Sequence, residues 1–140
     1  NLSVRENILF RLPKRADTTA RLQEKLQQLN CQINLDASAS TLEVADQQMV
    51  EILRGLMREA RILILDEPTE GIQPSVIKEI GEVIRQLASR GDMAILLVEQ
   101  FYDFAADLAD SYLVMSRGSI VQRGGGSNME QDGVPGLVAI

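Results

Sequence analysis

The sequence predicts an α/β fold in which a small parallel sheet packs against helices. The apolar run Ile62-Leu63-Ile64-Leu65 stops at Asp66-Glu67, a pattern typical of a strand buried on both faces. A helical pattern follows, and Met93 to Val98 is a second strand-sized apolar run, so the order strand, helix, strand indicates a βαβ unit. Aromatic residues make up only 4% of the chain, and an aliphatic composition of this kind favours a sheet packed on helices.

Three helices are expected before this unit. Ser3 and Glu6 have the spacing of a capping box, which predicts a short helix through about Leu12. The second helix is predicted over 17–30, where leucines recur at helical spacing. The third should run from about Leu42 to Glu59, with a buried stripe of Met49, Ile52, Leu53, Leu56 and Met57.

The helix between the two strands and the segments after them follow from local signals. Pro74 suits the first turn of a helix that Gly91 would end. A further helix is expected over 102–109, and then an antiparallel hairpin of 112–115 and 120–122 around the Arg117-Gly118 turn. From Gly124 onward the composition is typical of a linker.

Composition and charge exclude several classes of function. A net charge of -6 provides no positive field for nucleic acid. With one Cys and no His, neither a Cys/His zinc cluster nor a Ser-His-Asp triad can form. The run from Met93 to Val98 is far shorter than the roughly twenty apolar residues of a membrane span. We therefore expect a cytoplasmic chain, without direct membrane insertion, that reaches a membrane only through a protein partner.

Two acids stand where α/β folds place their ligands, at the carboxyl end of a predicted parallel strand. In nucleotide hydrolases the first such acid, here Asp66, holds Mg²⁺, and the second, here Glu67, polarises the attacking water. A strand that simply ends in solvated acids would give the same short pattern. From these residues alone the two interpretations remain open.

The wider stretch resembles ABC ATPases. Leu63-Ile64-Leu65-Asp66-Glu67-Pro68-Thr69 matches their Walker B segment letter for letter, and the stretch from Gln47 to Leu53 resembles the helix after their signature sequence. The resemblance implies an α/β fold: an incomplete P-loop NTPase (ABC ATPase) core with part of the helical subdomain. It also implies ATP and Mg²⁺ as cofactors, with Asp66 as the Mg²⁺-side acid and Glu67 as the catalytic carboxylate.

The same resemblance assigns two further positions. Gly71 falls in the D-loop, which joins the two ATP sites of a dimer in the family. Gln100 stands at the switch position, commonly a His that contacts the γ-phosphate, so it is expected in the catalytic site. A Gln donates a hydrogen bond but carries no charge. The plain alternative is a polar residue that leads into a helix.

The signature segment departs from the family pattern. Leu42-Glu43-Val44-Ala45-Asp46 aligns with Leu-Ser-Gly-Gly-Gln, which should bind the γ-phosphate of a partner subunit's ATP through backbone N–H groups. Glu43 would repel that phosphate by roughly 4 kcal/mol at about 4 Å and an effective dielectric constant of about 20. Alternatively, Ser40-Thr41-Leu42-Glu43 is a second capping-box spacing in which the acid serves the helix start.

No phosphate-binding loop is found in the sequence. Such a loop needs G-x-x-x-x-G-K followed by Ser or Thr, and Lys14, Lys25 and Lys78, the only lysines, have no such setting. In a complete ABC subunit this loop precedes the position of Leu2, so we expect a chain truncated before the signature that does not bind ATP well. The unpaired strand edges would then invite pairing or aggregation.

The resemblance has two sources. Residues 1 to about 65 resemble autoinducer-2 and sugar importer ATPases, and about 70 to 140 resemble urea and branched-chain amino acid importer ATPases. A recombined or engineered chain would give this pattern. We divide the chain into a helical subdomain with a degenerate signature segment (1–60), a Walker B to switch region (61–123) and a C-terminal tail (124–140).

Three functional hypotheses remain at this point. The first is an ATP-hydrolysing importer subunit at the inner membrane, whose partners are permease subunits and a second ATPase subunit. The second is a non-catalytic fragment that acts through protein interaction. The third, a RecA-like helicase fragment, is disfavoured by the acidic charge and the lack of a basic or aromatic nucleic-acid surface.

Overall fold

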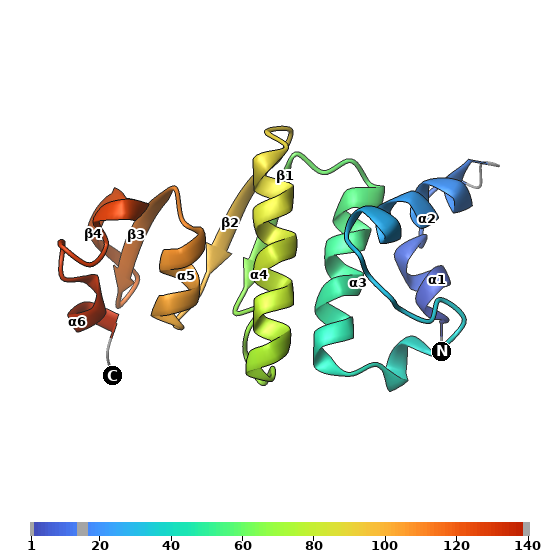
Figure 1. Ribbon diagram of the computed structural model, residues 1–140, viewed down its shortest axis with the longest axis horizontal. Helices are drawn as coiled ribbons and strands as arrows, with labels where there is room; N and C mark the ends of the chain where they lie inside the picture. The colour runs from blue at the N-terminus through green and yellow to red at the C-terminus, as the bar shows by residue number, and fades with distance from the viewer. Residues whose placement is uncertain (1, 14–16, 139–140) are drawn as a thin grey trace.

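The computed structural model describes residues 2–13 and 17–138 (Figure 1). Outside the described residues lie Asn1, Lys14 and 139–140. Asn1 and 139–140 are the outer ends of the two segments that resemble different importer ATPases. The elements in chain order are α1 (Val4–Ile8), α2 (Thr18–Gln28), the 3-10 turn η1 (Ala39–Thr41), α3 (Val44–Met57), β1 (Ile62–Asp66), α4 (Pro74–Ser89), β2 (Ala94–Val98), α5 (Tyr102–Leu108), β3 (Ser111–Ser116), β4 (Ser119–Gly125), the 3-10 turn η2 (Gly126–Asn128) and α6 (Val134–Val138).

Helix α1 begins with the predicted capping box. Ser3 Oγ accepts a hydrogen bond from the Glu6 backbone N–H at 3.2 Å, and a Glu6 carboxylate oxygen accepts from the Ser3 N–H at 2.8 Å. The helix ends at Ile8, earlier than the predicted end near Leu12. Arg11 takes a left-handed backbone with φ of 61°, which an α-helix cannot accommodate.

Helices α2 and α3 supply much of the main core. Leu22 of α2 is fully buried, and α3 buries a stripe along its inner face. The predicted stripe is confirmed except that Met49 is half-buried and its neighbour Val50 is buried. In the main core these side chains meet the buried residues of β1 and α4, and Figure 1 shows α3 and α4 side by side.

The strand–helix–strand prediction is confirmed. Strands β1 and β2 pair in parallel, with Ile62 opposite Ala94 and Asp66 opposite Val98. Helix α4 has Pro74 in its first turn, and Gly91 just after it has φ of 70°. This left-handed conformation favours glycine and ends the helix. The arrangement sets the carboxyl ends of both strands next to each other.

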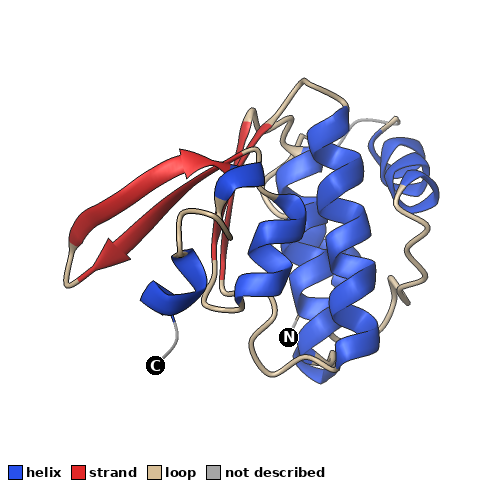
Figure 2. Cartoon of the chain, turned by 60° about the vertical axis from the view of Figure 1, so that its left-hand side comes forward, coloured by secondary structure: helices blue, strands red, loops and turns tan. Residues whose placement is uncertain are grey.

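Strand β1 is covered on one face only, so the prediction of burial on both faces is wrong. Leu63 and Leu65 are 8% and 4% exposed, whereas Ile62 and Ile64 are 67% and 64% exposed. Consecutive side chains of a strand point to opposite faces. Among the described residues, the helices that pack on this pair of strands lie on one side of it (Figure 2).

The segment after Gly124 is folded, so its interpretation as a linker is wrong. Strand β4 pairs with β3 through Gly125. This is the predicted hairpin, which is a few residues longer than predicted and has a bulge at Val114/Met115. A Cβ on Gly126 would lie 1.7 Å from the backbone oxygen of Ala109, so this glycine permits a close backbone approach. A second, smaller core of Tyr112, Val114, Met129 and Val134 holds the described part of this segment, through Val138, against β3.

Within residues 2–13 and 17–138, no helix has both the length and the apolar character needed to span a bilayer.

Candidate functional site

The predicted catalytic residues meet at the carboxyl edge of the β1–β2 pair. Asp66 ends β1 opposite Val98, which ends β2. The backbone N–H of Glu67 donates to the Val98 carbonyl at 2.8 Å, extending the pairing beyond the last residue of β1. Gln100, 33 residues after Glu67 in the sequence, lies at the same edge and donates its side-chain amide to a Glu67 carboxylate oxygen. The structure therefore brings Asp66, Glu67 and Gln100 together.

Glu67 has a backbone conformation unusual for a side chain with a Cβ. Its φ is 46°, in the left-handed region that costs roughly 1–2 kcal/mol for an L-residue. The half-buried side chain turns out of the strand at this point. Residues held in such conformations are frequent at functional sites, and here the turn sets the carboxylate against Gln100.

Glu99 is a member of this edge that the sequence analysis missed. One carboxylate oxygen accepts from the Thr69 N–H at 3.0 Å and from the Thr69 hydroxyl at 2.7 Å. The other accepts from the backbone N–H groups of Gln100 at 3.1 Å and Phe101 at 3.2 Å. The rule that singled out Asp66, an acid at the end of a parallel strand, applies equally to Glu99.

Asp66 is exposed at the strand end. No group of three or more His, Cys, Asp or Glu side chains that could hold a metal occurs in the part of the chain that the structure describes. Mg²⁺ at nucleotide sites commonly binds one or two carboxylates together with phosphate oxygens and water. Asp66 fits that type of coordination and does not form an all-protein metal cage.

Gly71 closes the turn after β1. Its φ is 71°, and no atom lies within 4 Å of the place where a Cβ would stand. Gly71 is exposed. The left-handed backbone conformation favours a glycine here, and there is no close neighbour that would exclude a larger side chain. The structure thus places Gly71 on the surface between the acids and α4.

The signature-like segment lies at the start of α3. Leu42 and Glu43 precede the helix, and 44–46 form its first turn. Helices α3 and α4 both begin at the lower end of Figure 1. No hydrogen bond between described residues links 42–46 to Asp66, Glu67 or Gln100. The structure therefore does not join the two groups directly.

The capping-box alternative for Glu43 is wrong. Glu43 stands at the N-cap of α3, but its side chain makes no capping hydrogen bond. Ser40 Oγ instead lies 2.9 Å from Ser38 Oγ, within the region of the short turn η1. The Gln47 side chain donates to the Leu42 carbonyl at 2.9 Å. The Glu43 side chain thus makes no hydrogen bond at the helix start.

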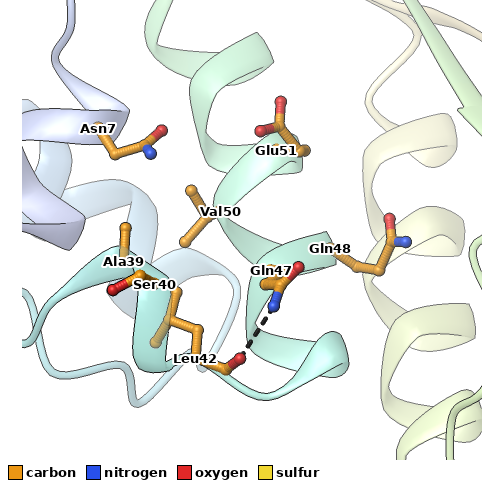
Figure 3. A pocket seen from close by; sticks show the side chains of 8 residues that line it. All are labelled: Asn7, Ala39, Ser40, Leu42, Gln47, Gln48, Val50 and Glu51. Atoms are coloured by element: carbon orange, nitrogen blue, oxygen red, sulfur yellow. Dashed lines mark hydrogen bonds between the residues drawn. The ribbon is translucent and has the colours of Figure 1, made fainter. Parts of the chain in front are cut away.

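A pocket of about 370 Å³ lies beside this segment, between α1, η1 and α3. Leu42 is the member of the signature-like segment that lines it, with Gln47 hydrogen-bonded to its carbonyl (Figure 3).

Asp46, on the first turn of α3, acts on another group: burial, and secondarily the negative charge of Asp46, raise the pKa of the Cys31 thiol to about 11.

Comparison with known proteins identifies the family. A family model described as ABC transporter matches residues 1–70 of the 140. The chain belongs to the ABC transporter family.

The relatives of this ABC chain are import ATP-binding proteins. It is 55% identical over 124 residues, 89% of its length, to the autoinducer 2 import ATP-binding protein LsrA of Enterobacter sp. (strain 638). It is 38% identical over 128 residues, 86% of its length, to a ribose import ATP-binding protein of Rubrobacter xylanophilus. With the branched-chain amino acid transport ATP-binding protein BraG of Pseudomonas aeruginosa it shares 40% identity over 89 residues, 64% of its length.

Those matches cover 25%, 26% and 38% of the three relatives, so the ABC chain spans about a quarter to two fifths of their length. The match to the first relative is long enough to include parts of both segments that resemble different importers. One relative therefore accounts for most of the chain.

Solved ABC cassettes have the same fold. A nucleotide-free ATP-binding cassette superposes with a TM-score of 0.83 at 22% identity, over 96% of the ABC chain and 59% of that cassette. The ADP conformation of another cassette gives a TM-score of 0.80 at 23% identity, over 98% of the chain and 62% of the cassette. The predicted fold class is confirmed: the ABC chain has part of an α/β P-loop NTPase fold of the ABC ATPase type.

Proposed function

We propose that this chain supplies the Mg²⁺-side acid and the catalytic carboxylate of an ABC importer ATPase. The observation that supports the proposal most directly is the hydrogen bond from the Gln100 side chain to Glu67 at the carboxyl edge of β1. Asp66, at the end of the same strand, is free to face solvent. In P-loop nucleotide hydrolases a Walker B Asp helps to hold Mg²⁺ and another polar residue orients the attacking water, and Asp66 and Glu67 stand where they could fill these two roles.

Each residue has a distinct role in this proposal. Mg²⁺, held by Asp66 and by ATP oxygens, would neutralise phosphate charge. Glu67 accepts the proton of the attacking water at a carboxylate oxygen, as general bases do. The Gln100 side-chain amide donates a hydrogen bond to a carboxylate oxygen of Glu67. Because an amide does not titrate, Gln100 keeps the same charge throughout.

The residues that bind the β- and γ-phosphates of ATP are not among these 140 residues. They contain no G-x-x-x-x-G-K sequence, so no lysine and no row of backbone amides is available for the β- and γ-phosphates. The chain by itself is therefore expected to bind ATP weakly and to be inactive. Residues that belong to the missing phosphate loop must complete the site.

We assign the transport of autoinducer-2 or a related sugar-like solute to the assembly. A relative that is 55% identical over 124 residues is named an autoinducer 2 import protein, and one that is 38% identical over 128 residues is named a ribose import protein. The shorter likeness to a branched-chain amino acid transport protein supports the alternative solute class. Permease subunits would hold the ATPase at the cytoplasmic face of the inner membrane.

A second ATPase subunit completes the proposed assembly. Glu70 and Gly71 are exposed in the turn after β1, and this side of the turn would face the other subunit's site. The segment of Leu42, Glu43, Val44, Ala45 and Asp46 would face the phosphate of the other subunit's ATP, where the negative charge of Glu43 opposes binding. In this division residues 1–60 form the helical subdomain, 61–123 the Walker B to switch region, and 124–140 the C-terminal tail.

A non-catalytic interaction role is the second candidate. The lack of a phosphate-binding loop, together with the negative charge of Glu43 at the start of α3, favours it. In that case the acids at the β1 edge would act on no substrate.

The two candidates differ in a complementation assay. The chain is mixed with a separately expressed portion of the 55%-identical relative that carries the phosphate loop, and Mg²⁺-dependent ATP turnover is measured. The first candidate predicts turnover that falls by at least about 100-fold in Glu67→Gln and is kept in the matched control Glu82→Gln, which removes an exposed carboxylate of α4. Turnover unaffected by Glu67→Gln would refute the catalytic assignment, and no turnover in any mixture would favour the interaction role.

A further inference from the structure

Glu99 joins the two loops at the carboxyl edge of the sheet. Thr69, in the loop after β1, follows Glu67 and Pro68, and it donates twice to one oxygen of Glu99. Gln100 and Phe101, in the loop after β2, donate to the other oxygen. The Glu99 carboxylate thus joins its own loop to Thr69, which lies 30 residues earlier in the sequence.

The carboxylate of Glu99 is fully engaged by these four donors. Each oxygen accepts two hydrogen bonds, which uses the acceptor sites of an ionised carboxylate. Hydrogen bonds to an ionised acceptor are stronger than neutral ones, and Thr69 is only 8% exposed. A carboxylate whose acceptor sites are all occupied in this way is poorly suited to bind a metal.

We infer that Glu99 is a positioning residue: it fixes the distance between the loop of Glu67 and the loop of Gln100, so that the Gln100 amide reaches the Glu67 carboxylate. The functional meaning of this contact rests on the proposed roles of Glu67 and Gln100. The contact itself is a property of the fold and can be measured without ATP.

The isosteric variant Glu99→Gln tests this role. A glutamine side chain keeps one acceptor oxygen and replaces the other with a donor, so it can satisfy Thr69 or the Gln100 and Phe101 amides but not both. The second variant, Thr69→Val, keeps the shape of a buried residue and removes only the hydroxyl contact. Glu82→Gln, on the exposed side of α4, is the matched control for the loss of one carboxylate.

The readout is the NMR signal of the Gln100 side-chain amide in ¹⁵N-labelled chain. Its position is assigned by its loss in Gln100→Ala and by its shift in Glu67→Ala, which removes the acceptor. The Gln122 side chain, which donates to the Tyr112 hydroxyl at 3.1 Å and to the Asp132 carbonyl at 2.8 Å, reports on the other sheet and serves as an internal reference for folding.

We expect the Gln100 signal in Glu99→Gln to move to the position of a free glutamine amide, with the Gln122 signal unchanged. The backbone amide of Thr69 or of Gln100 should exchange with solvent about tenfold faster. Thr69→Val should move the Gln100 signal part of the way, and Glu82→Gln should not move it.

A Gln100 signal that stays in place in both Glu99→Gln and Thr69→Val would overturn the inference. If Glu99→Gln also shifts the Gln122 signal, this variant disturbs the whole fold and Thr69→Val becomes the deciding variant. In that case a Gln100 signal that does not shift in Thr69→Val overturns the inference. Because no nucleotide is present, either result stands apart from the ATP turnover that tests the catalytic assignment.

Discussion

Leu63 and Ile64 are neighbours on β1, yet Leu63 is 8% exposed and Ile64 is 64% exposed. Their side chains point to opposite faces of the strand, and Leu63 belongs to the main core. We expect Leu63→Ala to lower the free energy of unfolding by about 2–4 kcal/mol, because it leaves a cavity. Ile64→Ala should change it by about 0.5 kcal/mol or less. Urea denaturation of the two variants measures both values, and an equal loss would mean that the face of Ile64 is covered in solution.

Gly126 and Gly136 respond differently to a methyl group. In Gly126→Ala the new Cβ would overlap the Ala109 backbone oxygen at 1.7 Å, and a backbone atom cannot rotate away. We expect a loss of about 3 kcal/mol and a melting temperature lower by roughly 10 °C. Gly136 has no atom within 4 Å of its Cβ position, so Gly136→Ala should be neutral or stabilising by up to about 1 kcal/mol. Thermal unfolding of both variants, followed by circular dichroism, checks the pair, and similar melting temperatures would contradict the close approach at Gly126.

The thiol of Cys31 should be unreactive at neutral pH. Burial first, and the charge of Asp46 second, raise its pKa from 9.0 to about 11, so the folded state holds the thiol proton more tightly than the unfolded state. The associated stability is present below pH 9 and is lost as the pH rises through about 11. Alkylation by iodoacetamide should have its midpoint near pH 11 in the folded chain and near 9 in urea.

Asp46→Asn provides the matched variant for this measurement. It removes only the second cause, so the alkylation midpoint should fall by less than the full difference between folded and unfolded chain. The same midpoint in the folded and urea-unfolded protein would contradict the burial of Cys31.

Tyr112 should lose its phenolic proton only at a pH above the usual range. Its burial, followed by its hydrogen bond to Asp132 at 2.5 Å, raises its pKa from 10.0. Above pH 10 the unfolded state therefore deprotonates first, and stability falls as the pH rises through the pKa of the folded state. Absorbance titration in a Tyr102→Phe background, which leaves Tyr112 as the only tyrosine, isolates this group.

Asp132→Asn should bring the pKa of Tyr112 part of the way back toward 10.0, because it removes the charge and leaves burial in place. An unchanged midpoint in Asp132→Asn would show that the hydrogen bond has no part in the shift.

The elements with strong local signals were predicted well. The capping box of Ser3 and Glu6, Pro74 at the start of α4, Gly91 after its end and the hairpin after Arg117-Gly118 all follow from residues within one or two turns of each other. Element ends such as that of α1 were less accurate, because the left-handed conformation of Arg11 has no strong sequence signal.

At the candidate site the sequence named Asp66, Glu67 and Gln100 as candidates, whose roles stay predictions, and it did not show how these residues are held. The strand ending in Asp66 and Glu67 was readable from an apolar run followed by acids, and the position of Gln100 followed from family resemblance. Glu99 was overlooked because its partner Thr69 lies 30 residues away, and the sequence spacing between them carries no periodic signal.

The sequence by itself determined the order of the main helices and strands as far as the β3–β4 hairpin, the resemblance to the family and the acids at the end of β1, because these depend on neighbouring residues and on a contiguous motif. Only the tertiary structure decided that Ile62 and Ile64 are uncovered, that Gly126 packs on Ala109, and that Glu99 bridges two loops. Each of these depends on which distant segments pack together, and the free energy of such packing comes from burial and hydrogen bonds between segments rather than from local preference.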